Sequence, residues 1–116
     1  KFGSYTGNGN ADGPFIFTNF RPALVIAKRT DSSGFWRILD NKRDPHNVAH
    51  HALFANDNSN ESDTDSSSSY NTDFLSNGFK LRTTLASSNS SGGTWIYMAW
   101  AESPFKNWRA CDICLA

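Results

Sequence analysis

DFLSNGFKLRT, residues 73–83, is the stretch of sequence that decides the fold. Two short arms flank Asn77-Gly78, and Asn-Gly is the pair that most readily adopts the two positive φ angles of a type I′ hairpin turn. In the second arm, residues 79–83, apolar and charged side chains alternate, so that one face is apolar and the other is charged. The stretch therefore predicts an antiparallel hairpin that buries one face.

Similar short runs, rich in aromatic and β-branched residues, recur on both sides of this hairpin. They are separated by Gly, Asn, Asp and Ser, and they cover residues 2–6, 15–18, 23–28, 35–40, 48–55 and 95–100. Short strands that alternate with turn residues are typical of an all-β sandwich or barrel. We therefore predict an all-β fold, an antiparallel β-sandwich of the jelly-roll or lectin-like kind.

Some of these runs also indicate a position in the sandwich. Residues 2–6 are expected at a sheet edge. Residues 23–27 do not alternate, which favours a central strand buried on both faces. Residues 95–100 are aromatic on both faces, so that this strand is either internal or covered by a partner. Residues 48–55 fit a helix or a strand, and the strand is favoured because the neighbouring runs are strands.

Composition limits the functions that the chain can serve. The 116 residues suffice for one domain with its own core, which we place at residues 1–106, followed by a tail at 107–116. Eleven basic and 11 acidic residues give a net charge of +0, which argues against a nucleic-acid partner. No apolar run approaches the ~20 residues of a membrane helix, so no membrane insertion is expected. Because Lys1 stands where an initiator Met would, we expect a processed product or a segment of a longer protein.

Taken as a set, several turn-and-strand phrases resemble a β-rich domain near the C-terminus of tail-fibre and related virion proteins of tailed bacteriophages. The resemblance implies a concanavalin-like sandwich, a virion or extracellular location, homo-oligomers and contacts with other virion proteins, and it supplies no catalytic residues. The phrases lie at residues 3–9, 13–15, 20–23, 26–30, 36–45, 73–82 and 97–102, and the tail with its two cysteines departs from the pattern.

Two polar loops are the expected contact regions, because binding residues concentrate on loops that a rigid scaffold carries. The first, residues 56–72, is low in complexity and cannot bury apolar surface. The second covers residues 87–93. We predict that they touch a host surface glycan or protein, as in a tail-fibre or receptor-binding domain. The alternative is a capsid decoration or tail-assembly subunit that contacts only virion proteins. The residues singled out for binding are Asp57, Asp63, Asp65, Tyr70 and Asn89.

Metal and redox chemistry have weaker signals, and no metal or cofactor is expected. Ca²⁺ could bind the acidic residues of the first loop, but the EF-hand spacing is absent and a solvated loop is favoured. His46, His50 and His51 form an H-x-x-x-H-H pattern. On a helix His46 and His50 would share a face and could bind zinc, but surface histidines are favoured. Cys111 and Cys114 form a C-x-x-C pattern, which is typical of a redox pair or of half a zinc site. The context that a redox pair needs is absent, and a zinc site would need two more ligands, for which the three histidines are the available candidates, so a plain tail is favoured.

The sequence does not indicate an enzyme. Asp40, Asp44 and Glu102 are conceivable as a carboxylate pair, but nothing in the sequence brings them together. Tryptophan side chains could stack on sugar rings, and burial in the core is the favoured alternative because three of them fall in expected strands. These tryptophans are Trp36, Trp95 and Trp100, and Trp108 lies in the tail.

Overall fold

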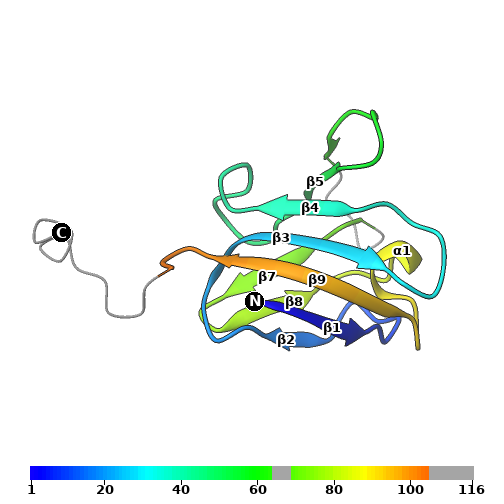
Figure 1. Ribbon diagram of the computed structural model, residues 1–116, viewed down its shortest axis with the longest axis horizontal. Coiled ribbons are helices and arrows are strands. Elements are labelled where there is room, and N and C mark those ends of the chain that lie inside the picture. Colours follow the sequence, from blue (N-terminus) through cyan, green and yellow to red (C-terminus); the bar gives the residue numbers. More distant parts are fainter. Residues whose placement is uncertain (64–68, 105–116) are drawn as a thin grey trace, which may run out of the picture.

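The computed structural model describes residues 1–63 and 69–104, which fold into two antiparallel sheets (Figure 1). The larger sheet has six strands in the order β1-β9-β3-β4-β5-β6, and the smaller has three in the order β2-β8-β7. The strands of the larger sheet are β1 (Phe2–Thr6), β9 (Thr94–Ala101), β3 (Pro22–Arg29), β4 (Arg37–Asp40), β5 (His51–Phe54) and β6 (Ser62–Asp63). Those of the smaller sheet are β2 (Phe15–Phe17), β8 (Gly78–Leu81) and β7 (Thr72–Leu75).

The prediction of an all-β antiparallel sandwich is confirmed. Each expected strand is present, including β5 in the ambiguous stretch, and β1 lies at the edge of its sheet because β9 is its sole partner in the described part of the chain. Ala49, in the connection that precedes β5, forms a bridge to Thr72 of the smaller sheet with two backbone hydrogen bonds of 2.9 Å. No helix in the described residues has the length and apolarity that crossing a membrane requires.

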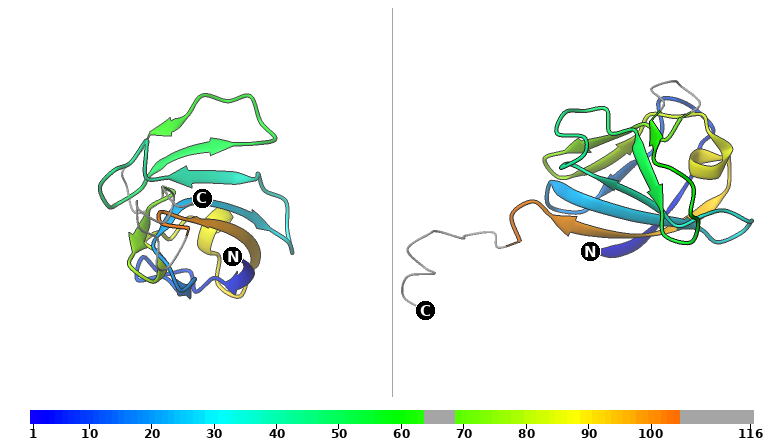
Figure 2. Two further views of the ribbon diagram at one scale, coloured as in Figure 1. Left: turned by 60° about the vertical axis from the view of Figure 1, so that its left-hand side comes forward. Right: turned by 90° about the horizontal axis from the view of Figure 1, so that it is seen from above.

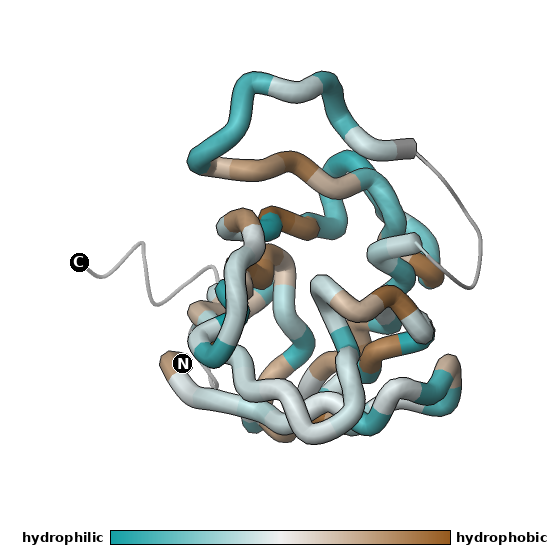
Figure 3. Tube along the Cα trace, turned by 90° about the vertical axis from the view of Figure 1, so that its right-hand side faces the viewer, coloured by the Kyte–Doolittle hydropathy of each residue, from teal (hydrophilic) through white to brown (hydrophobic). Residues whose placement is uncertain are grey.

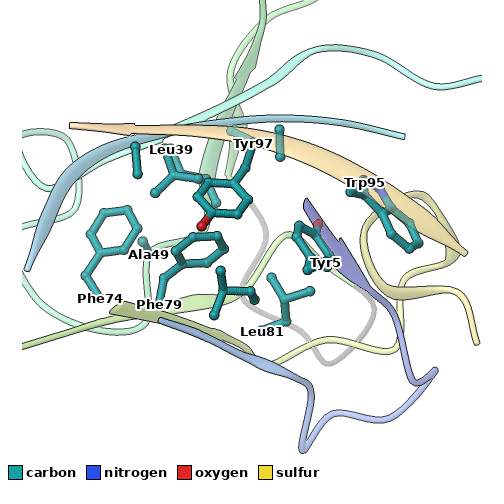
Figure 4. Packing of buried hydrophobic residues seen from close by; sticks show 13 residues of the cluster. Tyr5, Leu39, Ala49, Phe74, Phe79, Leu81, Trp95 and Tyr97 are labelled. Atoms are coloured by element: carbon teal, nitrogen blue, oxygen red, sulfur yellow. The ribbon is translucent and has the colours of Figure 1, made fainter. Parts of the chain in front are cut away.

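The core lies between the two sheets, and five of its 13 buried hydrophobic residues are aromatic (Figure 4). Trp95 of β9 stacks on Tyr5 of β1, with ring centroids 5.3 Å apart and ring planes 2° from parallel. Phe79 of β8 meets Tyr97 edge-on at 5.2 Å. Such pairs contribute about 0.5–1.5 kcal/mol each beyond their buried area. The alternation within β9 therefore fixes which face of the larger sheet turns inward.

The β7–β8 hairpin forms where the sequence predicts it, but the expected type I′ turn at Asn77-Gly78 is wrong. Leu75 pairs with Gly78, which places Ser76 and Asn77 in the turn and makes Gly78 the first residue of β8. None of these turn residues has a positive φ, which the described residues show at Asn19, Gly9 and Gly92. Gly78 serves close packing instead, because a Cβ there would collide with the carbonyl oxygen of Ile16 on β2.

Four further expectations need correction. The stretch 56–72 is not wholly a loop, since β6 pairs with β5 and β7 begins at Thr72. Within the expected loop 87–93, residues 87–89 belong to the single helical turn α1 (Ala86–Asn89). Residues 23–27 form a central strand, but only one of its faces is buried, and the other is half-buried. The expected strand 35–40 begins at Arg37.

The β5–β6 arm extends beyond the two packed sheets (Figure 2). Residues 55–61 connect its two strands, and residues 56–61 are hydrophilic (Figure 3). Residues 64–68 and 105–116 lie outside the described part of the chain, so the expectations for the tail, Trp108, Cys111 and Cys114 remain predictions.

Candidate functional site

The outer face of the six-stranded sheet, which points away from the smaller sheet, carries a continuous apolar surface. One row crosses five strands, because Phe2 pairs with Met98, Met98 with Ile26, Ile26 with Ile38, and Ile38 with Leu53. Leu24 and Trp100, which pair with each other, lie on one side of this row, and Ile96 lies on the other. We call this surface the outer face: Phe2, Leu24, Ile26, Ile38, Leu53, Ile96, Met98 and Trp100.

Several outer-face side chains remain open to solvent. Phe2 is 74% exposed, Trp100 44% and Ile96 43%. An antiparallel sheet with one solvated face normally places polar residues on that face. Strand β9 breaks this rule, because Ile96, Met98 and Trp100 point outward while Trp95, Tyr97 and Ala99 point into the core. The sequence indicated this two-sided pattern, and the expectation that Trp100 is a core residue is wrong.

Trp36 adds to this surface from the connection that precedes β4. Its side chain is half-buried, and together with Phe2, Ile96 and Met98 it lines a hollow of about 390 Å³. Nearly all of the hollow's lining is apolar. A sugar site needs polar groups that bind hydroxyls alongside an aromatic platform. The hollow therefore suits an apolar side chain of another protein better than a glycan.

Charged residues mark opposite ends of the outer face. Lys28 follows Ile26 on β3, and Asp40 pairs with Leu24 at the other end. Burial raises the pKa of the Asp40 carboxyl, but hydrogen bonds lower it by more, so that the pKa lies below its usual 3.8. The donors are the backbone N–H groups of Arg43 and Lys42 and the Arg43 guanidinium at 2.7 Å. Asp40 therefore stays ionised at neutral pH.

The structure does not bring the predicted binding residues together. Asp57 is half-buried after β5 and accepts a hydrogen bond from the Ser59 hydroxyl, whereas Asp63 pairs through its backbone with His51. Asp65 lies outside the described residues. Tyr70 does not project from a loop, because its ring packs on Phe54 at 5.3 Å and against the core. The Ca²⁺ hypothesis for this loop remains a prediction.

Asn89 has a structural position that the sequence did not indicate. Its side chain is fully buried at the end of α1. The carboxamide donates to the carbonyl oxygens of Asn10 and Thr83, both at 2.8 Å, and accepts from the backbone N–H of Asn8 at 2.9 Å. This burial argues against direct contact with a partner, and the hydrogen bonds tie the loop after β1 to α1.

The candidate carboxylates each have a different partner. Asp40 pairs with Arg43, and Glu102 pairs with Arg21 at 3.1 Å. Asp44 is buried and contacts His51 at 2.5 Å, with His50 beside it. His46 is exposed, as expected of a surface histidine, whereas His50 and His51 are half-buried and lie against Asp44. The sequence indicated the histidines as candidate zinc ligands but gave no signal that Asp44 joins them, because Asp44 precedes them by six and seven residues along an irregular connection.

Comparison with known proteins adds a family but no function. The family described as a domain of unknown function, DUF7483, matches residues 1–104, which include every described strand. No curated protein and no solved structure matches the chain. The resemblance to phage tail-fibre domains therefore remains a prediction.

Proposed function

We propose that this chain, which belongs to the DUF7483 family, is a non-enzymatic structural domain that assembles with further copies of itself through the outer face of its six-stranded sheet. The observation that carries the proposal is the apolar row across five strands, with Phe2 and Trp100 among the exposed side chains of that face. If the resemblance to phage virion proteins holds, the self-assembling domain corresponds to a subunit of a phage fibre or shell.

The chemistry of the face favours a protein partner. Exposed aromatic and Met side chains are enriched in protein interfaces, and charged residues are depleted at their centres. Large contiguous apolar patches on soluble proteins mark such interaction sites. The centre of the outer face holds Met98, Ile26 and Ile38, and the charged Lys28 and Asp40 lie toward its ends.

Charge placement favours a second copy as the partner. A two-fold axis along the apolar row lays one row on the other and reverses the strand direction between copies. Lys28 of one copy then lies over the end of the face where its partner's Asp40 is found. An axis along the strands would instead bring like charges together at both ends. A net charge of +0 adds no general repulsion between copies.

Each single contact is expected to be weak. Strands of four to eight residues, at a spacing of about 4.8 Å and a rise of about 3.3 Å per residue, give a flat area of roughly 450 Å². A standard interface buries about 800 Å² per partner. Stable assembly then depends on repetition of the contact in a symmetric particle, where linked copies gain avidity.

Sedimentation velocity of the full chain tests the proposal. Protein concentrations of roughly 10 µM to 1 mM cover the affinities that are expected of weak contacts. We expect self-association that strengthens with concentration. Ile96→Lys places a charge on the outer face and should raise the midpoint concentration at least tenfold. Phe17→Lys is the matched control, since Phe17 is 55% exposed but lies on β2 of the smaller sheet. It should leave the midpoint unchanged.

Two results would overturn the proposal. One is a monomer over the whole concentration range. The other is an equal loss of association in Ile96→Lys and Phe17→Lys, which would locate the contact elsewhere. Circular dichroism of both variants verifies that each keeps the β fold.

Recognition of a host surface by the polar loops remains a second candidate function. The observation that favours it is the β5–β6 arm, whose hydrophilic tip at residues 56–61 extends beyond the sandwich (Figures 2 and 3). A chain that stays monomeric, binds host envelope glycans and loses this binding when residues 56–61 are replaced by Gly and Ser would support this function over self-assembly.

A further inference from the structure

The connection between β4 and β5 folds so that three potential metal ligands meet. They are the carboxylate of Asp44, whose side chain is 5% exposed, and the half-buried imidazoles of His50 and His51. Each of the three offers a ligand atom within 4.8 Å of the other two. The Asp44 Oδ1 atom lies 2.5 Å from the His51 Nδ1 atom and 3.9 Å from the His50 Nδ1 atom.

Backbone hydrogen bonds hold the carboxylate in place. The Asp44 Oδ2 atom accepts the backbone N–H groups of His50 at 2.9 Å and His51 at 2.8 Å. Oδ2 is thereby occupied, and Oδ1 is turned toward the two rings. The chain next to His50 is also held in place, because Ala49 forms a backbone bridge to Thr72 of the smaller sheet. The chain thus fixes the carboxylate before any ligand arrives, which lowers the cost of binding.

The geometry favours a cation at Oδ1. The Asp44 side chain is 5% exposed, and its Oδ1 atom faces two imidazoles while two backbone N–H groups hold Oδ2. The ring centroids of His50 and His51 lie 4.3 Å apart, so that both rings adjoin the same carboxylate.

The distances suit a small transition-metal ion. Zinc binds His nitrogen and carboxylate oxygen at about 2.0–2.1 Å in a tetrahedron, which places neighbouring ligand atoms about 3.3 Å apart. The 2.5 Å between Asp44 Oδ1 and His51 Nδ1 is shorter than this value and is a hydrogen bond without the ion. The His50 Nδ1 atom lies 3.1 Å from the Val48 carbonyl oxygen, to which only an N–H can donate, so that His50 would bind the ion through Nε2. An ion would displace the proton between Asp44 and His51, widen that gap and draw His50 closer. Imidazole ligands favour zinc and its transition-metal neighbours over Ca²⁺ or Mg²⁺.

We propose that Asp44, His50 and His51 bind a zinc-like divalent transition-metal ion, with water in the remaining coordination position. Two imidazoles and one carboxylate are a ligand count that zinc sites with an open position use. Binding the ion fastens the β4–β5 connection to the start of β5. This site is independent of the outer face and of self-assembly.

Cobalt titration of the full chain tests the site, after removal of metals with a chelator. We expect one Co²⁺ per chain with visible absorption bands, and displacement of that Co²⁺ by Zn²⁺. His50→Ala should weaken Co²⁺ binding at least tenfold. This variant removes a ligand and leaves the two backbone hydrogen bonds to Asp44 in place. His46→Ala is the matched control, because His46 belongs to the same connection but is exposed and outside the cluster. It should bind as the unmodified chain does.

The C-x-x-C pair must be separated from the cluster, because thiolates also bind Co²⁺ and Zn²⁺. A chain with Cys111→Ser and Cys114→Ser should keep the site, and its spectrum should lack thiolate charge-transfer bands. Three results would overturn the proposal. The first is a Kd for Co²⁺ weaker than about 100 µM, which corresponds to a binding free energy of about 5.5 kcal/mol. The others are Co²⁺ binding that His50→Ala leaves intact and Co²⁺ binding that is lost when the cysteines are replaced.

Discussion

Replacement of Asn89 by Ala is expected to lower the free energy of unfolding by about 2–4 kcal/mol. The Asn89 side chain is fully buried and makes three hydrogen bonds, at 2.8–2.9 Å, to Asn8, Asn10 and Thr83. A typical net contribution is about 1 kcal/mol per bond. The bond to the Thr83 carbonyl is buried, whereas those to Asn8 and Asn10 are partly open, so that water can replace some of them.

Urea denaturation measures this loss. With an m-value of about 2 kcal/mol/M, in the middle of the range for small proteins, the midpoint should fall by roughly 1–2 M. Asn89→Asp keeps the shape but places an oxygen against two carbonyl oxygens, so it should destabilise at least as much as Asn89→Ala. Asn58→Ala is the matched control, since Asn58 is exposed. It should change the stability by less than about 0.5 kcal/mol.

A loss below about 1 kcal/mol in Asn89→Ala, at an unchanged m-value, would refute the reasoning, because it is less than the contribution of a single hydrogen bond. Loss of partner binding at unchanged stability would restore the interpretation of Asn89 as a contact residue.

Three further predictions concern packing and pH. Gly78→Ala should cost about 1–3 kcal/mol in urea denaturation because its Cβ would overlap the Ile16 carbonyl oxygen. Gly34→Ala, whose nearest neighbour atom would lie at 3.8 Å, should be almost neutral, and equal costs would contradict the packing argument. Burial raises the pKa of Tyr5 above 10.0 although Arg37 lowers it, so the folded state holds this proton more tightly. The resulting stability is present below the unfolded pKa and lost as pH rises, and Tyr5→Phe should therefore lose less stability than the unmodified chain between about pH 9 and pH 11. The pKa of Asp40 is lowered rather than raised, so the pH dependence is reversed. The stabilisation from the Asp40 carboxylate is present above pH 3.8 and is lost as the pH falls. Stability measured between about pH 5 and pH 2 should fall less in Asp40→Asn, and an equal fall would contradict this assignment.

Local patterns predicted the strands well, because short β-branched and aromatic runs between turn residues restrict the backbone strongly. The β7–β8 hairpin was placed correctly, but its turn was displaced by one residue. The Asn77-Gly78 pair favours a type I′ turn locally, yet packing of β2 on β8 requires a residue without a side chain at Gly78. A contact between segments about 60 residues apart thus outweighed the local turn preference, and no local pattern contains that contact.

The candidate sites were harder to predict for the same reason. The outer face joins Phe2, Met98 and Ile26 through the registers of three strands that are distant in sequence. Asp44 meets His50 and His51 only because the connection between β4 and β5 folds back on itself. Composition instead favoured the polar loops, whose residues are conspicuous in the sequence whether or not they lie together.

Strand β9 shows how much one sequence pattern can indicate by itself. A strand with large apolar side chains on both faces must be covered on both, either by the rest of its own chain or by a partner. The sequence could not distinguish these cases. In the fold, the smaller sheet covers Trp95 and Tyr97, and no element in the described part of the chain covers Trp100 or Ile96 to the same extent. The remaining apolar surface is the surface that the proposed self-assembly through the outer face would cover.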